Sequence, residues 1–207
     1  GFNNTEGVSN VFIGDSTGKN NTTGNRNIFV GKEAGESNTE GDLNIFMGEG
    51  AGNSNTTGLR NLFMGTHAGY NNTDGYLNIF LGVLAGTYNT TGDRNIFIGQ
   101  ASGYQNDTGS YNVFIGDRSG LLNRYGESNV FLGWQAGYFN SNGSENVFIG
   151  KEAGFYHENG SSNIFIGTGA GYAENGSNKL IIENSSVDSS QALIYGEFDF
   201  IRRNKAL

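Results

Sequence analysis

The apolar residues of this chain recur in a five-residue segment, Asn-φ-Phe-φ-Gly, where φ is Val, Ile, Leu or Met. The segment first occurs at residues 10–14 and returns with a constant 17-residue period, without insertion or deletion, up to a tenth copy at residues 163–167. Ten copies at one spacing identify a repeat array. The apolar part is short, β-branched or aromatic, and closed by Gly, so it predicts one short β-strand in each repeat.

The glycines follow the same period. Thirty of the 35 fall at three positions of the repeat, those of Gly14, Gly18 and Gly24. Each position indicates a backbone requirement, either a turn with positive φ or a close approach of two segments. A 17-residue unit with three such glycines is too short for a helical repeat. We therefore expect an all-β fold, a parallel β-solenoid of ten coils over residues 1–176, with neighbouring coils about 4.8 Å apart.

The pattern changes near the end of the chain. The interval from Gly160 to Gly176 is shorter by one than the repeat period, and two further apolar segments lie at residues 179–183 and 192–198. Because the end of a solenoid must be closed, we interpret residues 177–200 as a cap or junction with a different strand topology. Residues 201–207 are expected to be a frayed tail or the start of another element.

The alternation of side chains predicts an assembly. Successive strand residues point to opposite faces, so each Phe faces one side and its two aliphatic neighbours face the other. A strand that is apolar on both faces is buried on both, whereas a thin coil with a polar second half has an interior on one side only. We therefore predict a homotrimer around a common axis. Which face fills the coil is left open. The expected core or trimer ladder is Phe29, Phe46, Phe63, Phe80, Phe97, Phe114, Phe131 and Phe148.

Composition narrows the classes of partner. The formal net charge is -8 with only 12 Lys and Arg residues, and this balance argues against nucleic acid, whose phosphates need a basic surface. No apolar run approaches the roughly 20 residues of a membrane span, so no membrane insertion of this segment is expected. The chain has no Cys, which excludes disulfides and thiolate metal sites.

The repeat resembles known families. The Asn-φ-Phe-φ-Gly, Ala-Gly and Asn-Thr-x-Gly elements, as they stand in residues 27–41, are similar to the head repeats of trimeric autotransporter adhesins. They are closer to tail-fibre-like repeats that often precede a chaperone-of-endosialidase domain. The resemblance covers about residues 7–176 and implies a left-handed β-roll trimer that forms a rigid head or shaft. The 17-residue period and the Phe differ from the adhesin heads, so the detailed strand path cannot be transferred.

Aromatic residues gather in the second half of the array, at the variable positions just after the second glycine of each repeat. If they face solvent, they form a strip suited to stacking on sugars or to anchoring a protein partner. The alternative is that these rings pack over the Gly turn of the adjacent chain. The candidate receptor-contact residues are Tyr104, Trp134, Tyr138, Phe139, Phe155, Tyr156 and Tyr172.

No catalytic group emerges from the sequence, and the chain is not expected to be an enzyme. His67 and His157 occupy different repeat positions without a recurring Ser or Asp partner, so we expect surface roles for both. An enzyme built on a β-helix is also disfavoured, because no acid and base residues of this sequence converge on one site. Calcium suits Asn, Asp and carbonyl ligands, but an Asn ladder bonded to itself explains the Asn positions without an ion, and no cofactor is expected.

The first five repeats carry Thr at one position, from Thr22 to Thr90. A regular rank of Thr on a flat face can order water, so ice binding is the alternative function, although turn-forming Asn-Thr explains the same residues. Our first hypothesis is a structural attachment protein, the rigid trimeric head or shaft of a cell-surface adhesin or tail fibre. It would bind a cell-surface glycan or protein receptor and would be extracellular, on a cell surface or on a virion-like particle.

Overall fold

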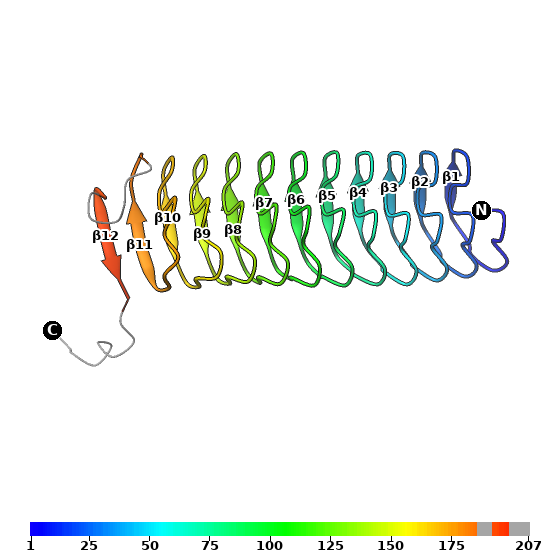
Figure 1. The fold of residues 1–207 in the computed structure, drawn as a ribbon. Helices are drawn as coiled ribbons and strands as arrows, with labels where there is room; N and C mark the ends of the chain where they lie inside the picture. Colours follow the sequence, from blue (N-terminus) through cyan, green and yellow to red (C-terminus); the bar gives the residue numbers. More distant parts are fainter. Residues whose placement is uncertain (186–191, 199–207) are drawn as a thin grey trace.

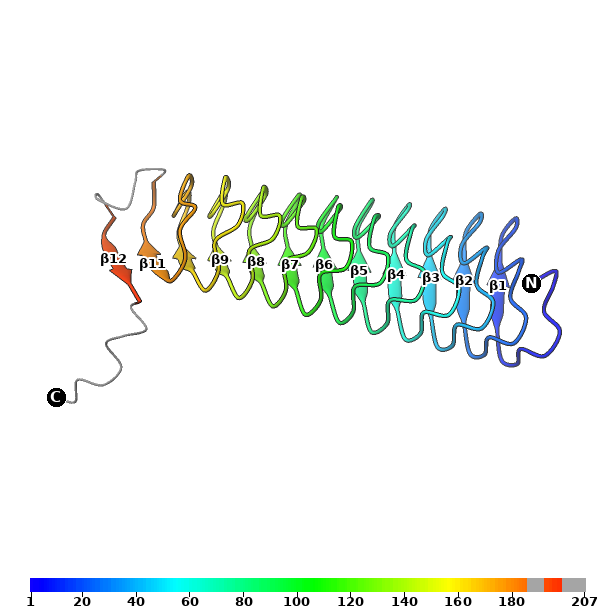
Figure 2. The ribbon, with the colours of Figure 1, turned by 60° about the horizontal axis from the view of Figure 1, so that its bottom comes forward.

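The computed structural model describes residues 1–185 and 192–198, and these form a rod of stacked coils (Figure 1). The predicted tail at 201–207 and part of the predicted junction lie outside the described residues. The chain runs from one end of the rod to the other, one coil after the next (Figure 2). The predicted parallel β-solenoid of about ten coils with 17-residue spacing is confirmed.

Each coil contributes one short strand to a single sheet whose order follows the sequence. The parallel pairs keep one register throughout, so that Phe29 pairs with Phe46, and Phe46 with Phe63. The described residues contain no helix, and therefore none that could cross a membrane. The strands are β1 Val11–Ile13, β2 Ile28–Val30, β3 Ile45–Met47, β4 Leu62–Met64, β5 Ile79–Leu81, β6 Ile96–Ile98, β7 Val113–Ile115, β8 Val130–Leu132, β9 Val147–Ile149, β10 Ile164–Ile166, β11 Lys179–Ile182 and β12 Ile194–Glu197.

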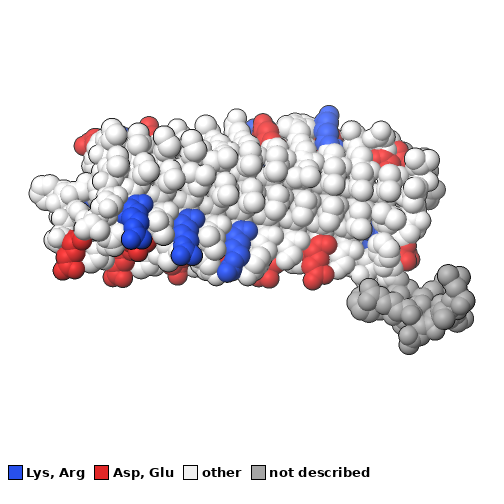
Figure 3. All heavy atoms as spheres, turned by 180° about the vertical axis from the view of Figure 1, so that it is seen from behind, with Lys and Arg blue, Asp and Glu red and all other residues white. Residues whose placement is uncertain are grey.

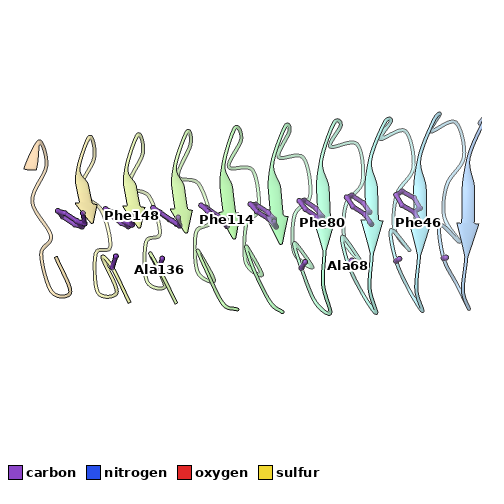
Figure 4. Close-up of a cluster of buried hydrophobic side chains, with 14 of the residues drawn as sticks. Phe46, Ala68, Phe80, Phe114, Ala136 and Phe148 are labelled. Carbon is purple, nitrogen blue, oxygen red and sulfur yellow. The ribbon is translucent and has the colours of Figure 1, made fainter. Parts of the chain in front are cut away.

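The phenylalanines fill the coil, which answers the question that the sequence left open. From Phe29 to Phe165 each ring is fully buried within the single chain. Neighbouring rings stack with centroids 4.7–4.9 Å apart, close to the predicted coil spacing. Figure 4 shows the rings in one row, with the small residues Ala68 and Ala136 in a second row beside them. The ladder expected as core or trimer contact is thus the core of one chain.

Two ladders of buried Asn side chains flank the phenylalanines. In the first, the side-chain oxygen of Asn78 accepts the backbone N–H of Asn95 at 2.9 Å, one coil further on. In the second, Asn89 Nδ2 donates to Asn72 Oδ1 at 2.8 Å. Both ladders also donate to the same carbonyl, Gly92 O, at 2.8 and 3.0 Å. The coils repeat this arrangement along the rod, so the buried amides are paired within and between coils, except at Asn140 Oδ1.

Two of the glycine positions show why a side chain is excluded there. Gly86 has φ of +58°, and a Cβ would lie 2.5 Å from the Phe80 ring. Gly92 has no positive φ, but a Cβ there would lie 2.5 Å from Asn89 Oδ1. The first position is a left-handed turn that packs on a ring, and the second is a close approach at the junction of the two Asn ladders.

Two other positions of the coil adopt positive φ, and in most coils neither is glycine; the exceptions are Gly50 and Gly169. One is the residue before the Asn that precedes each strand, such as Leu43 with φ of 59°. The other lies two residues after the glycine that closes the strand, such as Glu33 with φ of 58°. The conformation costs an L-residue about 1–2 kcal/mol. It is compensated because the N–H of Leu43 reaches Asn25 O at 3.0 Å and that of Glu33 reaches Asp15 O at 2.8 Å, both in the preceding coil. Because many different residue types occupy these two positions, the sequence did not predict their positive φ.

The last coil differs from the others. Ile181 of β11 takes the place of the buried Phe and pairs with Phe165, although the step between them is shorter by one than the repeat period. Strand β12 then pairs antiparallel with β11, with Ile181 opposite Tyr195. This reversal ends the parallel stack within the segment that the sequence marked as a cap.

The ring ladder predicts a position-specific loss of stability. Phe97 lies between Phe80 and Phe114, with centroids 4.8 and 4.9 Å away. Phe97→Ala removes both stacks and leaves a cavity, so we expect the free energy of unfolding to fall by about 3–5 kcal/mol. Guanidinium unfolding at one protein concentration, followed by circular dichroism, measures the loss. Val83→Ala is the control because Val83 is 48% exposed; equal losses in the two variants would contradict the ladder as the source of stability.

Candidate functional site

The segment that returns from the second to the third glycine of each coil carries the candidate residues. We call it the return segment; in the first coil it is residues 19–23. Its backbone joins neighbouring coils, for example through Tyr156 N to Tyr172 O at 2.8 Å. Because the backbone bonds run along the rod, side chains at equivalent positions of consecutive coils stack in columns. The third residue of the segment, Asn21 in the first coil, belongs to the second Asn ladder, whereas substitutions at its outward positions change the surface only.

The return segments of the last coils form a compact aromatic cluster. Tyr138, Phe155 and Tyr172 stack in one column, with ring centroids 5.1 and 5.2 Å apart. Phe139 and Tyr156 stack in the next column at 5.1 Å. Tyr156 is 45% exposed and the other four rings are partly exposed. We call these five residues the aromatic cluster; the structure brings together five of the seven predicted contact residues.

The other two predicted residues lie elsewhere. Trp134 is at the position that follows the strand's glycine, not in a return segment, and the Lys151 ammonium lies 5.0 Å from its ring centroid. Tyr104 is three coils before Phe155 in the same column, and its ring meets Tyr88 edge to face at 5.0 Å. The predicted strip is therefore discontinuous, because Leu121 separates Tyr104 from the aromatic cluster in this column.

The sequence analysis did not identify two further surface residues that contact aromatic rings, Tyr88 and Arg94. Tyr88 lies two residues after the second glycine of its coil, the same position as Phe139 and Tyr156 in the later coils. Arg94 lies between Tyr76 and Tyr111, 4.8 and 5.2 Å from their ring centroids, and donates to both hydroxyls. Writing every column of the repeat in full would have revealed Tyr88, whereas the contacts of Arg94 depend on turn geometry.

Charge is sparse on the rod surface. Figure 3 shows charged side chains mainly along the edges of one face, with an uncharged band between them along the rod. Most of the ion pairs are exposed, as in Lys32 with Glu33 at 3.4 Å and Lys32 with Glu49 at 3.9 Å. Such pairs contribute little to stability. Most of the rod surface is therefore formed by uncharged apolar and hydrogen-bonding side chains.

The Thr column has a structural role in the coil. The hydroxyls of Thr22, Thr39 and Thr56 donate to the backbone carbonyl of the equivalent residue in the next coil, at 3.0–3.2 Å. Those of Thr73 and Thr90 donate at 2.6 Å to the carboxylates of Asp74 and Asp107. These side chains are only partly exposed.

Across residues 1–185 and 192–198, no group of three or more His, Asp or Glu side chains is arranged to hold a metal ion.

His157 is fully buried, so the expectation of a surface role for it was wrong. It occupies the position of the second Asn ladder, where Asn140 precedes it. Its ring edge meets the rings of Phe148 and Phe165 at 5.2 and 5.4 Å. Asn140 Oδ1, which an Asn at 157 would pair, is buried without a hydrogen-bond partner. His67, by contrast, is half-buried and packs edge to face on Tyr70.

The surroundings of His157 favour the neutral ring. Nδ1 contacts Glu174 O, and Nε2 lies 2.9 Å from Gly160 O. A neutral ring has a single N–H, so it can donate to only one of these two carbonyls. Burial lowers the pKa of His157 below its ordinary value of 6.5, against the opposing effect of the carbonyls of Gly160 and Glu174 and of the Glu174 carboxylate. Since no reacting partner faces it, His157 is part of the core.

No protein-family model matches this chain, and no similar protein was found among curated proteins or solved structures.

Restoring the Asn ladder at residue 157 should stabilise the fold. In His157→Asn the new amide can donate to Asn140 Oδ1 and Gly160 O, as Asn140 itself donates to Asn123 Oδ1 and Gly143 O. Satisfying a buried acceptor is worth about 1–3 kcal/mol, and the lost ring contacts offset part of it. We expect a net gain of about 1 kcal/mol in chemical unfolding at pH 7.5; a loss of stability would contradict this account of the ladder.

The same variant should change the pH dependence. The unfolded chain protonates His157 near pH 6.5, whereas the folded chain keeps it neutral to lower pH. Stability is therefore lost as pH falls below 6.5, and the loss levels off below the folded-state pKa. His157→Asn should lack this component in thermal unfolding from pH 7.5 to 5. The control, His67→Asn, leaves His157 in place and should retain it; identical pH profiles for the two variants would refute the assignment.

Proposed function

We propose that this chain is a rigid attachment segment, the head or shaft of a cell-surface adhesin or a tail fibre, and that it works as a homotrimer outside the cell or on a virion-like particle. The observation that carries this proposal is the outer face of the sheet. All twenty residues that flank the phenylalanines in β1–β10 are Val, Ile, Leu or Met. Because the rings point inward, these aliphatic side chains point away from the core of the chain.

This outer strand face, the two columns that begin at Val11 and Ile13, is partly exposed along the single chain, and none of its residues is fully buried. Ile28, Met64 and Ile115 are 40, 41 and 40% exposed, although neighbours above and below cover part of each. A continuous apolar patch on this scale, bordered by polar positions, marks an interface in soluble proteins. Parallel sheets are normally covered on both faces.

Copies of this chain are the best occupant of the outer strand face. The face repeats with the coil spacing and carries no charged residue, so a second rod can lie alongside with the same register at every coil. Three copies around an axis are favoured by the resemblance of the repeat to trimeric adhesin heads and tail-fibre repeats. The Phe and Asn ladders of each chain supply stiffness, and three such rods side by side form a stiffer shaft.

Recognition belongs to the outward columns that the assembly leaves free. The aromatic cluster presents ring faces and Tyr hydroxyls, which suit a sugar ring or an apolar anchor of a protein. Its five residues fall outside both columns of the outer strand face. The proposed partner is a cell-surface glycan or protein receptor, and the proposed role is non-catalytic.

Light scattering on the purified protein tests the assembly. We expect three times the 22.1 kDa chain mass. Ile98→Glu places a charge on the outer strand face and should release monomers that retain the circular dichroism of the solenoid, because burying an unpaired carboxylate costs several kcal/mol. The control is Thr91→Glu, since the same column already carries Glu40 and Asp74. A wild-type protein that stays at the mass of one chain would contradict the proposal.

A further inference from the structure

Side chains of three consecutive return segments line an open depression of about 450 Å³, which lies outside the aromatic cluster. Its volume falls within the range of about 300–1,000 Å³ that is typical of small-molecule sites. Besides Thr90, the lining residues are Tyr88, Tyr104, Gln105, Asp107, Arg124 and Tyr125.

The side chains of this depression are not required by the coil. Asp107 and Arg124 stand where the first five coils carry Thr. The backbone nevertheless continues unchanged, because Thr90 N donates to Asp107 O at 2.9 Å and Asp107 N to Arg124 O at 3.0 Å, as Thr56 N does to Thr73 O at 2.8 Å. The change from Thr to Asp and Arg therefore alters the surface and leaves the ladder intact.

The polar groups are held in place but retain bonding capacity. Thr90 Oγ1 donates to Asp107 Oδ1 at 2.6 Å. Arg124 donates through Nε and Nη2 to Gln105 Oε1, at 3.3 and 3.2 Å. Neither charged residue belongs to an ion pair within the described residues. A guanidinium has five N–H donors and a carboxylate about four acceptor sites, so donors and acceptors remain for a ligand.

Aromatic rings form the rest of the lining. Tyr88 and Tyr104 meet edge to face at 5.0 Å, which fixes the two rings at nearly a right angle. Tyr88 and Tyr125 are 47 and 51% exposed. Each ring offers an apolar face beside a hydroxyl, so the depression combines flat apolar walls with fixed polar groups.

We propose that this depression binds a neutral saccharide, with a pyranose ring against the tyrosines and its hydroxyls on Asp107, Gln105 and Arg124. A pyranose presents C–H groups on its faces and hydroxyls, each both donor and acceptor, around its edge. The lining supplies the complementary groups, with acceptors on Asp107, donors on Arg124 and both kinds on Gln105. This inference rests on the proposed attachment function and names the ligand class and a site for it.

Other ligand classes fit less well. A phosphate or an acidic polymer would face the Asp107 carboxylate on a chain of net charge -8. An acyl chain would leave the carboxylate and the guanidinium without partners and would cover polar groups at a cost. A neutral saccharide avoids both penalties.

Saturation-transfer NMR and titration calorimetry on the full chain test the proposal. The probes are the methyl α- and β-pyranosides of glucose, galactose, mannose and N-acetylglucosamine at millimolar concentration, with glucuronate as the charged comparator. The site variant is Asp107→Thr with Arg124→Thr, which restores the residue of the first five coils and should keep the fold. The control variant, Tyr111→Ser, changes a tyrosine that is 54% exposed and lies outside both the depression and the aromatic cluster.

We expect at least one methyl glycoside to bind with a millimolar Kd, and the site variant to weaken this binding about tenfold or more, while Tyr111→Ser leaves it unchanged. The proposal is overturned if no glycoside binds, if glucuronate alone binds, or if the site variant binds as well as the wild type. Light scattering on the same samples tests the proposed trimer separately. If the protein is a trimer but binds none of these sugars, the saccharide proposal is wrong and the proposed assembly still holds.

Discussion

The buried amide ladders constrain the rest of this structure. An Asn side chain inside a coil has no water to bond, and an unpaired buried amide costs about 1–3 kcal/mol. The ladder amides are paired through the adjacent coil, as Asn106 Nδ2 is with Asn89 Oδ1 at 2.7 Å. That pairing works only when equivalent residues lie directly above one another, so any inserted residue would break the bonds of two coils. The constant 17-residue period and the stacked phenylalanines follow from the same requirement.

The interior was largely predictable because it repeats. The strand, the coil spacing and the meaning of the glycine positions could be derived from the period and from the physics of parallel strands. The direction of the Phe side chains could not, because both faces of the strand are apolar in sequence, and only the coil path decides which one is enclosed. Left-handed residues such as Leu43 and Glu33 also escaped prediction, since no residue type marks them. His157 was misassigned because it was considered as a lone titratable residue instead of as a member of the Asn column that it interrupts.

The surface was less predictable because it does not repeat. Five of the seven aromatic residues chosen from sequence do lie together, since stacking brings residues 17 apart within about 5 Å of each other. Trp134 does not join them, because a position two residues after the strand faces a different side of the coil. The depression beside Tyr104 combines side chains from several columns, including Asp107 and Arg124, and their proximity depends on the path of the turns. Both surface features that we propose as binding sites are thus departures from the repeat.

One chain completes its own core, and our central proposal is that the outer strand face contacts other copies of the chain. A cysteine at Ile115 tests it directly, because the chain has no other Cys and Ile115 lies on that face. With a short thiol-to-thiol cross-linker at low protein concentration, the account predicts efficient linking of Ile115→Cys chains in pairs, while Thr57→Cys, on the return segment, remains single. If Ile115→Cys links no better than Thr57→Cys, the outer strand faces do not meet.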